Sequence, residues 1–62
     1  MNKLKNVRLG KRLYASDLAF AMGIPVHHYE EIEEGRRKLT HVEWHELADR
    51  LRVDVREIIP DL

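Results

Sequence analysis

The sequence predicts an all-α fold of five short helices, and three observations support this prediction. Apolar residues recur three and four positions apart, the spacing that places them on one face of a helix. Glycine and proline interrupt this pattern at short intervals, which keeps each helix short. Alternating apolar and polar runs, which would indicate strands, are scarce. A chain of 62 residues is expected to form a single domain over residues 1–62.

The first two helices are marked by apolar faces and by the turn that follows the second. We expect the first from about Lys3 to Arg12 and the second from about Ala15 to Met22. Ser16 is a candidate cap for the second helix, because hydroxyl oxygens accept hydrogen bonds from the free N–H groups at helix starts. Gly23 then suits the left-handed position that closes a helix.

Proline and glycine bound the third helix. Pro25 suits the first turn, since its missing N–H is not needed there. The helix is expected to run to about Glu34 and to close at Gly35. Tyr29 and Ile32 lie three residues apart and are predicted to face inward.

Capping signals mark the last two helices. Thr40 and Glu43 have the spacing of a capping box, which opens the fourth helix. An apolar stripe follows at helical spacing, formed by Trp44, Leu47, Ala48 and Leu51. This stripe favours a core position for Trp44 over the alternative of an interface anchor. Asp54 is expected to cap a last short helix that ends at Pro60.

The charges are balanced in number but segregated along the chain. There are 11 basic and 11 acidic residues, so the formal net charge is zero. The segment 1–13 holds basic residues and no acidic ones, the third helix is rich in glutamate, and Arg36, Arg37 and Lys38 follow it. A nucleic-acid partner needs a local basic footprint more than a net positive charge. Two such segments exist, with an acidic helix between them.

Several classes of protein are not expected from this sequence. Cysteine is absent, which excludes disulfides and thiolate metal sites. No apolar run approaches the roughly 20 residues that span a membrane, and the charged N-terminal segment does not match a signal peptide, so a cytoplasmic protein without a membrane partner is expected. His41 and His45 lie four apart, but solvated histidines are favoured over a metal site. We find no nucleophile–base pair, and we expect neither an enzyme nor a cofactor.

The segment from Leu18 to Gly35 carries the most informative pattern. It reads as a short helix with a Leu-Ala pair, a turn at Gly23 and a second short helix that ends in Glu-x-Gly. Ala19 is small enough for two helices to cross closely, and Gly23 permits the sharp turn. This is the helix-turn-helix arrangement, expected over about residues 15–35.

With these motifs in this order, the chain resembles the Cro/C1-type helix-turn-helix domains of phage and plasmid repressors, which have the lambda-repressor-like fold. The resemblance extends from Arg8 to Ile59. The matching pieces are Arg8, Leu18-Ala19, Gly23-Ile24, Ile32-Glu33 with Gly35, the basic loop Arg36-Arg37-Lys38, Leu47-Ala48 with Leu51, and the C-terminal Val53-Asp54-Val55 with Glu57-Ile58-Ile59.

The resemblance implies that the third helix lies in the major groove of double-stranded DNA. The residues that it places at base edges are Val26, His27 and Glu31. Those that it places near the DNA backbone are Tyr14, Ala15, His28, Glu34, Arg36, Arg37 and Lys38. It also implies a partly buried ion pair between Arg8 and Glu33. Finally, it suggests a dimer surface at Ile58, Ile59 and Leu62, for which a core-closing last turn is the alternative.

These expectations describe a sequence-specific transcriptional regulator, a small repressor of a phage, plasmid or similar element, acting as a monomer or a homodimer. Two departures from the family pattern bear on this hypothesis. Tyr14 and Ala15 stand where the family usually has a polar cap followed by glutamine, and Glu31 and Glu34 bring negative charge to the DNA-facing side. The alternative is a protein-interaction module on the same fold, such as an antirepressor, an antitoxin-like partner or an inhibitor, that binds a protein partner through its acidic third helix.

Overall fold

The computed structural model of the chain describes residues 3–60. This part of the chain contains α-helices, one short 3-10 helix and no strand, so the all-α prediction is confirmed. The elements are α1 (Lys3–Gly10), α2 (Ala15–Met22), α3 (Val26–Glu33), α4 (His41–Leu51) and the 3-10 helix η1 (Val55–Glu57). The prediction of five helices is wrong in its last member, which is a single 3-10 turn.

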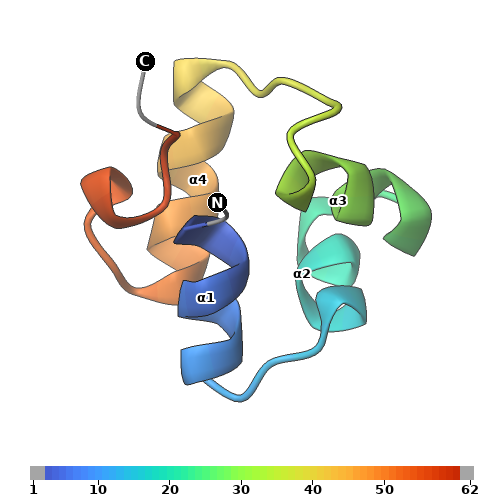
Figure 1. Cartoon of the computed structure of the whole chain (residues 1–62), viewed down its shortest axis with the longest axis horizontal. Coiled ribbons are helices and arrows are strands. Elements are labelled where there is room, and N and C mark those ends of the chain that lie inside the picture. The colour runs from blue at the N-terminus through green and yellow to red at the C-terminus, as the bar shows by residue number, and fades with distance from the viewer. Residues whose placement is uncertain (1–2, 61–62) are drawn as a thin grey trace.

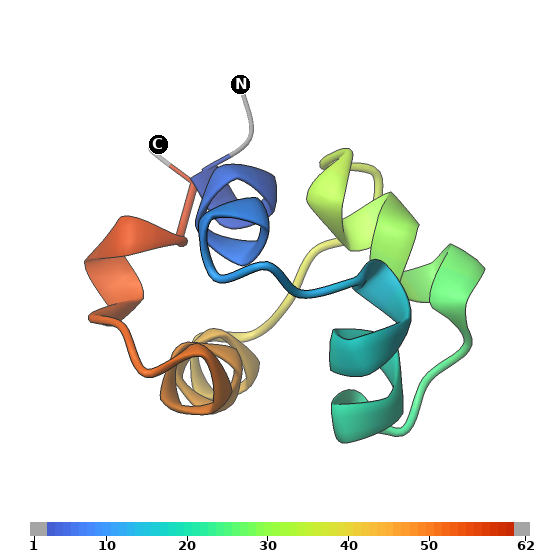
Figure 2. The ribbon, with the colours of Figure 1, turned by 90° about the horizontal axis from the view of Figure 1, so that it is seen from below.

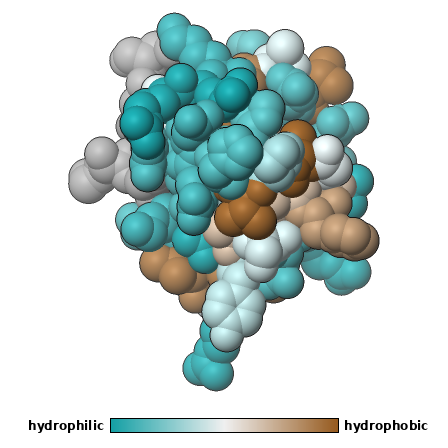
Figure 3. Space-filling view, turned by 90° about the vertical axis from the view of Figure 1, so that its right-hand side faces the viewer, coloured by the Kyte–Doolittle hydropathy of each residue, from teal (hydrophilic) through white to brown (hydrophobic). Residues whose placement is uncertain are grey.

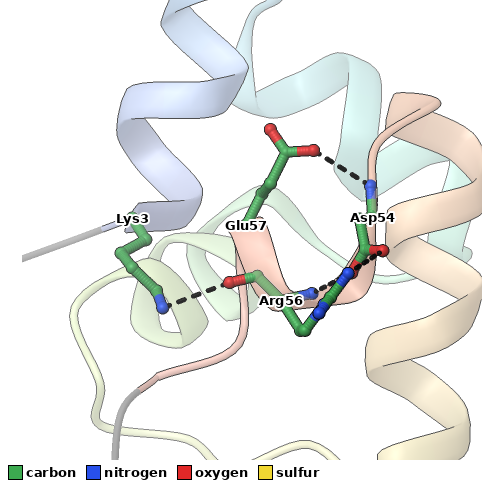
Figure 4. Close-up of polar contacts among 4 residues, drawn as sticks. All are labelled: Lys3, Asp54, Arg56 and Glu57. Carbon is green, nitrogen blue, oxygen red and sulfur yellow. Dashed lines mark hydrogen bonds and ion pairs between the residues drawn. The ribbon is translucent and has the colours of Figure 1, made fainter.

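The turn η1 is short because side chains fix its start and a proline follows closely. The Asp54 carboxylate accepts from the Arg56 N–H at 2.8 Å, and the Asp54 N–H donates to Glu57 Oε2 at 3.1 Å (Figure 4). Pro60 lies just beyond, and the residue before a proline disfavours the α conformation. A longer α-helix therefore has little room between Asp54 and Pro60.

The elements fall into two groups. In two perpendicular views α1, α4 and η1 lie on one side of the molecule, and α2 and α3 lie on the other (Figure 1, Figure 2). The segments 11–14 and 34–40 connect the groups. The start of α1 lies against η1, where Lys3 Nζ donates to the carbonyl oxygen of Arg56 at 3.3 Å (Figure 4).

A cluster of buried apolar side chains holds the elements together. It draws on all of the α-helices described and on the residue after η1: Leu4, Leu18, Ala19, Tyr29, Ile32, Trp44, Leu47, Ala48, Leu51 and Ile58. Each large aliphatic side chain stabilises the fold by about 1.5–3 kcal/mol through its removal from water. Trp44 belongs to this core, as the apolar stripe of α4 predicts.

Two helix starts show how local chemistry sets the boundaries. The Thr40 hydroxyl accepts from the Glu43 N–H at 3.1 Å, and the Thr40 N–H donates to Glu43 Oε1 at 2.8 Å, so the predicted capping box is confirmed. The prediction for Ser16 is wrong, because α2 begins at Ala15 with Tyr14 in the cap position. There the Asp17 carboxylate accepts from the Tyr14 N–H at 2.7 Å, so Asp17 rather than Ser16 makes the side-chain contact at the start of α2.

Each α-helix of residues 3–60 is closed by a residue with a left-handed backbone. Gly23 (φ 71°) and Gly35 (φ 79°) take this conformation after α2 and α3, as predicted. Arg12 (φ 61°) and Arg52 (φ 59°) take it after α1 and α4, although this conformation is costly for a residue with a side chain. The first helix ends at Gly10, so the prediction that it runs to Arg12 is too long.

Candidate functional site

The pair of helices α2 and α3 is built around a sharp turn. Gly23 supplies the left-handed residue, and the Ile24 N–H donates to the Ala19 carbonyl oxygen at 3.0 Å, which closes α2. Ala19 is almost fully buried, so its small side chain lets the helices pack closely. Tyr29 and Ile32 turn the inner face of α3 into the core. The opposite face of α3 is left to solvent.

That outer face carries the residues that the resemblance places at base edges. Val26 and His27 are exposed, and Glu31 is half-buried one turn further along the helix. Glu30 and Glu34 are exposed beside them, and His28, expected near the DNA backbone, is half-buried. Figure 3 looks onto the side of the molecule where α2 and α3 lie, with hydrophilic side chains over its upper part and hydrophobic ones across its middle.

Three basic residues follow α3 directly, and two of them are paired with glutamates. Arg36, Arg37 and Lys38 are all exposed. Arg37 Nε donates to Glu31 Oε1 at 2.6 Å, and Arg36 Nη2 donates to Glu34 Oε1. The hydrogen bond from Arg37 holds the pKa of Glu31 below its usual value, with Arg36 and His27 adding to the effect. The acidic face of α3 and the basic loop therefore form one connected charged surface.

A buried ion pair fixes the end of α3 to α1. Arg8 Nε donates to Glu33 Oε2 at 2.6 Å and Arg8 Nη2 to Glu33 Oε1 at 3.2 Å, with only 7% and 8% of the two residues exposed. Arg8 Nη1 donates to the carbonyl oxygen of Leu13 at 2.8 Å, so the same side chain also fixes the segment that leads into α2. The hydrogen bond to Glu33 raises the pKa of Arg8.

Tyr29 adds a feature that sequence reasoning missed. Its side chain is fully buried, and its hydroxyl has no hydrogen-bond partner among the described residues. Burial raises the pKa of the hydroxyl well above its usual value, and the neighbouring Glu33 carboxylate adds to this. The apolar spacing correctly predicted that Tyr29 faces inward, but it carries no information on a hydrogen-bond partner for the hydroxyl.

The start of α2 differs from what a phosphate-binding helix end requires. Tyr14 is largely exposed and Ala15 is half-buried. The Asp17 carboxylate occupies the Tyr14 N–H, and its negative charge lies in the first turn of α2. A helix N-terminus attracts anions through its free N–H groups and positive partial charge. Asp17 offsets both.

The apolar residues expected at a dimer surface are placed differently by the structure. Ile58 is 1% exposed and belongs to the core, so it is not a surface residue. Ile59 is half-buried and packs against that core, while Leu62 lies outside the described residues. Phe20 on α2 is instead a strongly exposed hydrophobic side chain, which sequence reasoning did not single out.

The remaining candidates gather no recognisable chemistry in residues 3–60. His41 and His45 are exposed on α4, and the described residues contain no group of three side chains suited to hold a metal ion. A hollow of about 570 Å³ is lined by α1, the end of α3, α4 and the residues after η1. The Glu33 carboxylate at its wall is already bound by Arg8. None of the helices described has the length and apolar content to cross a membrane.

Comparisons with known proteins found no relative of this chain. No protein-family model matches the chain, and neither a curated protein nor a solved structure matches it.

Proposed function

We propose that this chain is a sequence-specific DNA-binding regulator of transcription, a small repressor of the phage and plasmid type, with α3 as its recognition helix. The observation that carries the proposal is the outer face of α3, which is held out by the turn at Gly23 and followed at once by the exposed basic loop 36–38. The major groove of B-DNA admits an α-helix. A basic loop at one end of that helix is suited to the adjacent phosphates.

The residues of this surface divide into two roles. Val26, His27 and Glu31 face the base edges and give sequence preference. Contacts with the DNA backbone give affinity and register, and the residues placed near it are His28, Glu34, Arg36, Arg37 and Lys38, with Tyr14 and Ala15 at the start of α2. Among these, the two arginines and Lys38 supply the positive charge. Glu34 opposes binding through its negative charge.

The ion pair between Arg8 and Glu33 supports this role indirectly. A recognition helix must be presented at a fixed angle, and a buried two-pronged ion pair fixes the end of α3 against α1. Neither residue touches DNA in this proposal. Both are positioning residues.

A homodimer on DNA is the second part of the proposal. Two copies related by a two-fold axis would place two α3 helices about one DNA turn, ~34 Å, apart, and would read a palindromic site. Repression would follow from occlusion of a promoter. A concentration series by sedimentation, with and without a palindromic duplex, distinguishes a monomer, a preformed dimer and a dimer that forms on DNA.

The decisive experiment measures DNA affinity over a salt series by fluorescence anisotropy, with a mixed-sequence duplex. We expect binding that weakens steeply with salt, and a slope that falls by about 0.9 for each phosphate-contacting cation removed. The variant Arg36→Ala/Arg37→Ala should lose slope, by up to about two units. Its matched control is Arg50→Ala/Arg56→Ala, which removes the same charge from α4 and η1. Equal slopes for the two variants would contradict the assignment of the basic loop.

A second function is favoured by one observation: Arg36 and Arg37 are both occupied by glutamates. In that case α3 presents a partly neutralised acidic face to a basic protein surface, as an antirepressor, an antitoxin-like partner or an inhibitor would. This alternative expects no DNA binding even at low salt. It also expects binding to a protein partner. The variant Arg36→Glu/Arg37→Glu should retain this binding, and Glu30→Lys/Glu34→Lys should abolish it.

A further inference from the structure

Both guanidinium groups of the basic loop are paired with glutamates. Arg37 is held by Glu31, with Nε donating to Oε1 at 2.6 Å, and Arg36 is held by Glu34. Glu31 lies in the last turn of α3 and Glu34 directly follows the helix, at the end from which the loop departs. Each arginine is therefore partly neutralised and held in one orientation by a carboxylate, which competes with the DNA backbone for it.

Breaking either ion pair is easy, but it leaves the glutamate carboxylate without its partner. Exposed ion pairs are weak, so breaking them costs little. The freed carboxylate, however, then lies beside a polyanion, where it is repelled unless it finds a donor. Glu34 is placed near the DNA backbone, where the neighbouring groups are phosphates and offer its carboxylate no donor. Glu31, on the outer face of α3, meets base edges instead.

Base edges differ in what they offer to a carboxylate. In the major groove cytosine presents the N4 amino donor, whereas guanine presents acceptors at O6 and N7 and thymine an acceptor at O4. Adenine carries an amino donor beside the N7 acceptor. A carboxylate is therefore satisfied best by cytosine, and it is repelled by guanine and thymine.

We infer that Glu31 and Glu34 are specificity-determining residues that compete with DNA phosphates for Arg37 and Arg36, and that Glu31 releases Arg37 to the backbone only where a cytosine amino group replaces the guanidinium. This inference rests on the proposed DNA-binding function. It assigns a use to the acidic residues of α3: they lower the affinity for DNA of arbitrary sequence and couple phosphate binding by Arg37 to one base.

The test compares Glu31→Ala with Glu30→Ala. Both variants remove one negative charge from α3, but Glu30 forms no ion pair with the loop among the contacts described. On mixed-sequence DNA the wild type keeps Arg37 paired with Glu31, so Arg37 contributes little to the release of counterions. Glu31→Ala should therefore steepen the salt slope on mixed-sequence DNA by up to about 0.9. It should also tighten binding at low salt roughly fivefold, the loss of one weak ion pair. Glu30→Ala should leave the slope unchanged.

Two further measurements isolate the exchange itself. In an Arg37→Ala background, Glu31→Ala should no longer steepen the slope, because there is no guanidinium to release. Selection from a randomised duplex should give wild-type sites with cytosine fixed at one position. Glu31→Ala should lose that preference while the other positions persist.

The outcomes separate this inference from the function on which it rests. If the wild type binds DNA and Glu31→Ala behaves like Glu30→Ala, the inference is overturned and the proposed function stands. If neither the wild type nor Glu31→Ala/Glu34→Ala binds duplex DNA at low salt, while both show helical circular dichroism, the proposed function fails and the inference fails with it. If only the double variant binds, the glutamates are shown to suppress a real DNA-binding surface.

Discussion

Arg8 on α1 and Glu33 at the end of α3 form a two-pronged ion pair that is almost wholly withdrawn from solvent. The pair joins residues 25 positions apart in the sequence. It also reaches the carbonyl oxygen of Leu13 through Arg8 Nη1, so one side chain ties together α1, α3 and the segment before α2. The position of the outer face of α3 therefore depends on a contact made on its buried side.

Removal of one partner should be far more damaging than removal of both. Glu33→Ala leaves a guanidinium buried without its carboxylate, and the free energy of unfolding should fall by about 3–5 kcal/mol. Arg8→Met/Glu33→Leu should recover most of this loss, because apolar side chains of similar volume need no partner. Urea unfolding followed by circular dichroism measures both.

The exposed ion pair between Arg56 and Asp54 provides the control for this prediction. Its side chains are largely in solvent, so Arg56→Ala should lower stability far less than Glu33→Ala does. If Glu33→Ala proves as mild as Arg56→Ala, the pair does not hold α3 to α1.

The pH dependence of stability should include a contribution from Asp54. Its hydrogen bonds with the Arg56 guanidinium and N–H lower its pKa from 3.8 to about 2 in the folded chain. Folding thus favours the charged carboxylate, and this stability is present above about pH 4 and lost as the pH falls to about 2. Asp54→Asn should abolish this part of the pH dependence. Urea unfolding across this range measures both proteins. If the wild type and Asp54→Asn give parallel profiles, Asp54 is not the source of this pH dependence.

The sequence predicted those features whose cause is local. Thr40 and Glu43 cap α4 through side chains three residues apart, and Gly23 and Gly35 close helices because glycine tolerates a positive φ. In each case the residue type itself carries the signal. The inward face of α4 was predictable for the same reason, since helical spacing alone defines it.

The features that the sequence did not predict depend on the path of the chain. Arginine has no preference for a left-handed backbone, so nothing in its identity marks Arg52 as a helix end. The pairing of Arg37 with Glu31 depends on how the loop folds back after Gly35, and six residues of separation do not specify it. The absence of a partner for the Tyr29 hydroxyl depends on packing from several elements.

The left-handed position of Arg52 should be improved by glycine. Arg52→Gly removes the steric cost of a positive φ in a closing turn where the Val53 N–H already donates to the Ala48 carbonyl oxygen at 3.1 Å. We expect the free energy of unfolding to rise by about 0.5–1 kcal/mol. Arg50→Gly, in the last turn of α4, is the matched control and should cost about 1 kcal/mol. Thermal unfolding compares them, and a fall in stability for both would contradict the strain at Arg52.

The buried hydroxyl of Tyr29 should reduce the stability of the chain. It is shielded from water and has no hydrogen-bond partner among the described residues, so folding removes its hydration without replacement. Tyr29→Phe deletes this group, leaves the ring in place, and should raise the free energy of unfolding by about 1 kcal/mol. Tyr14→Phe removes a hydroxyl from an exposed ring and should change nothing measurable. If Tyr29→Phe instead lowers the urea midpoint, the hydroxyl donates to the Glu33 carboxylate in solution and belongs to the same buried network as Arg8.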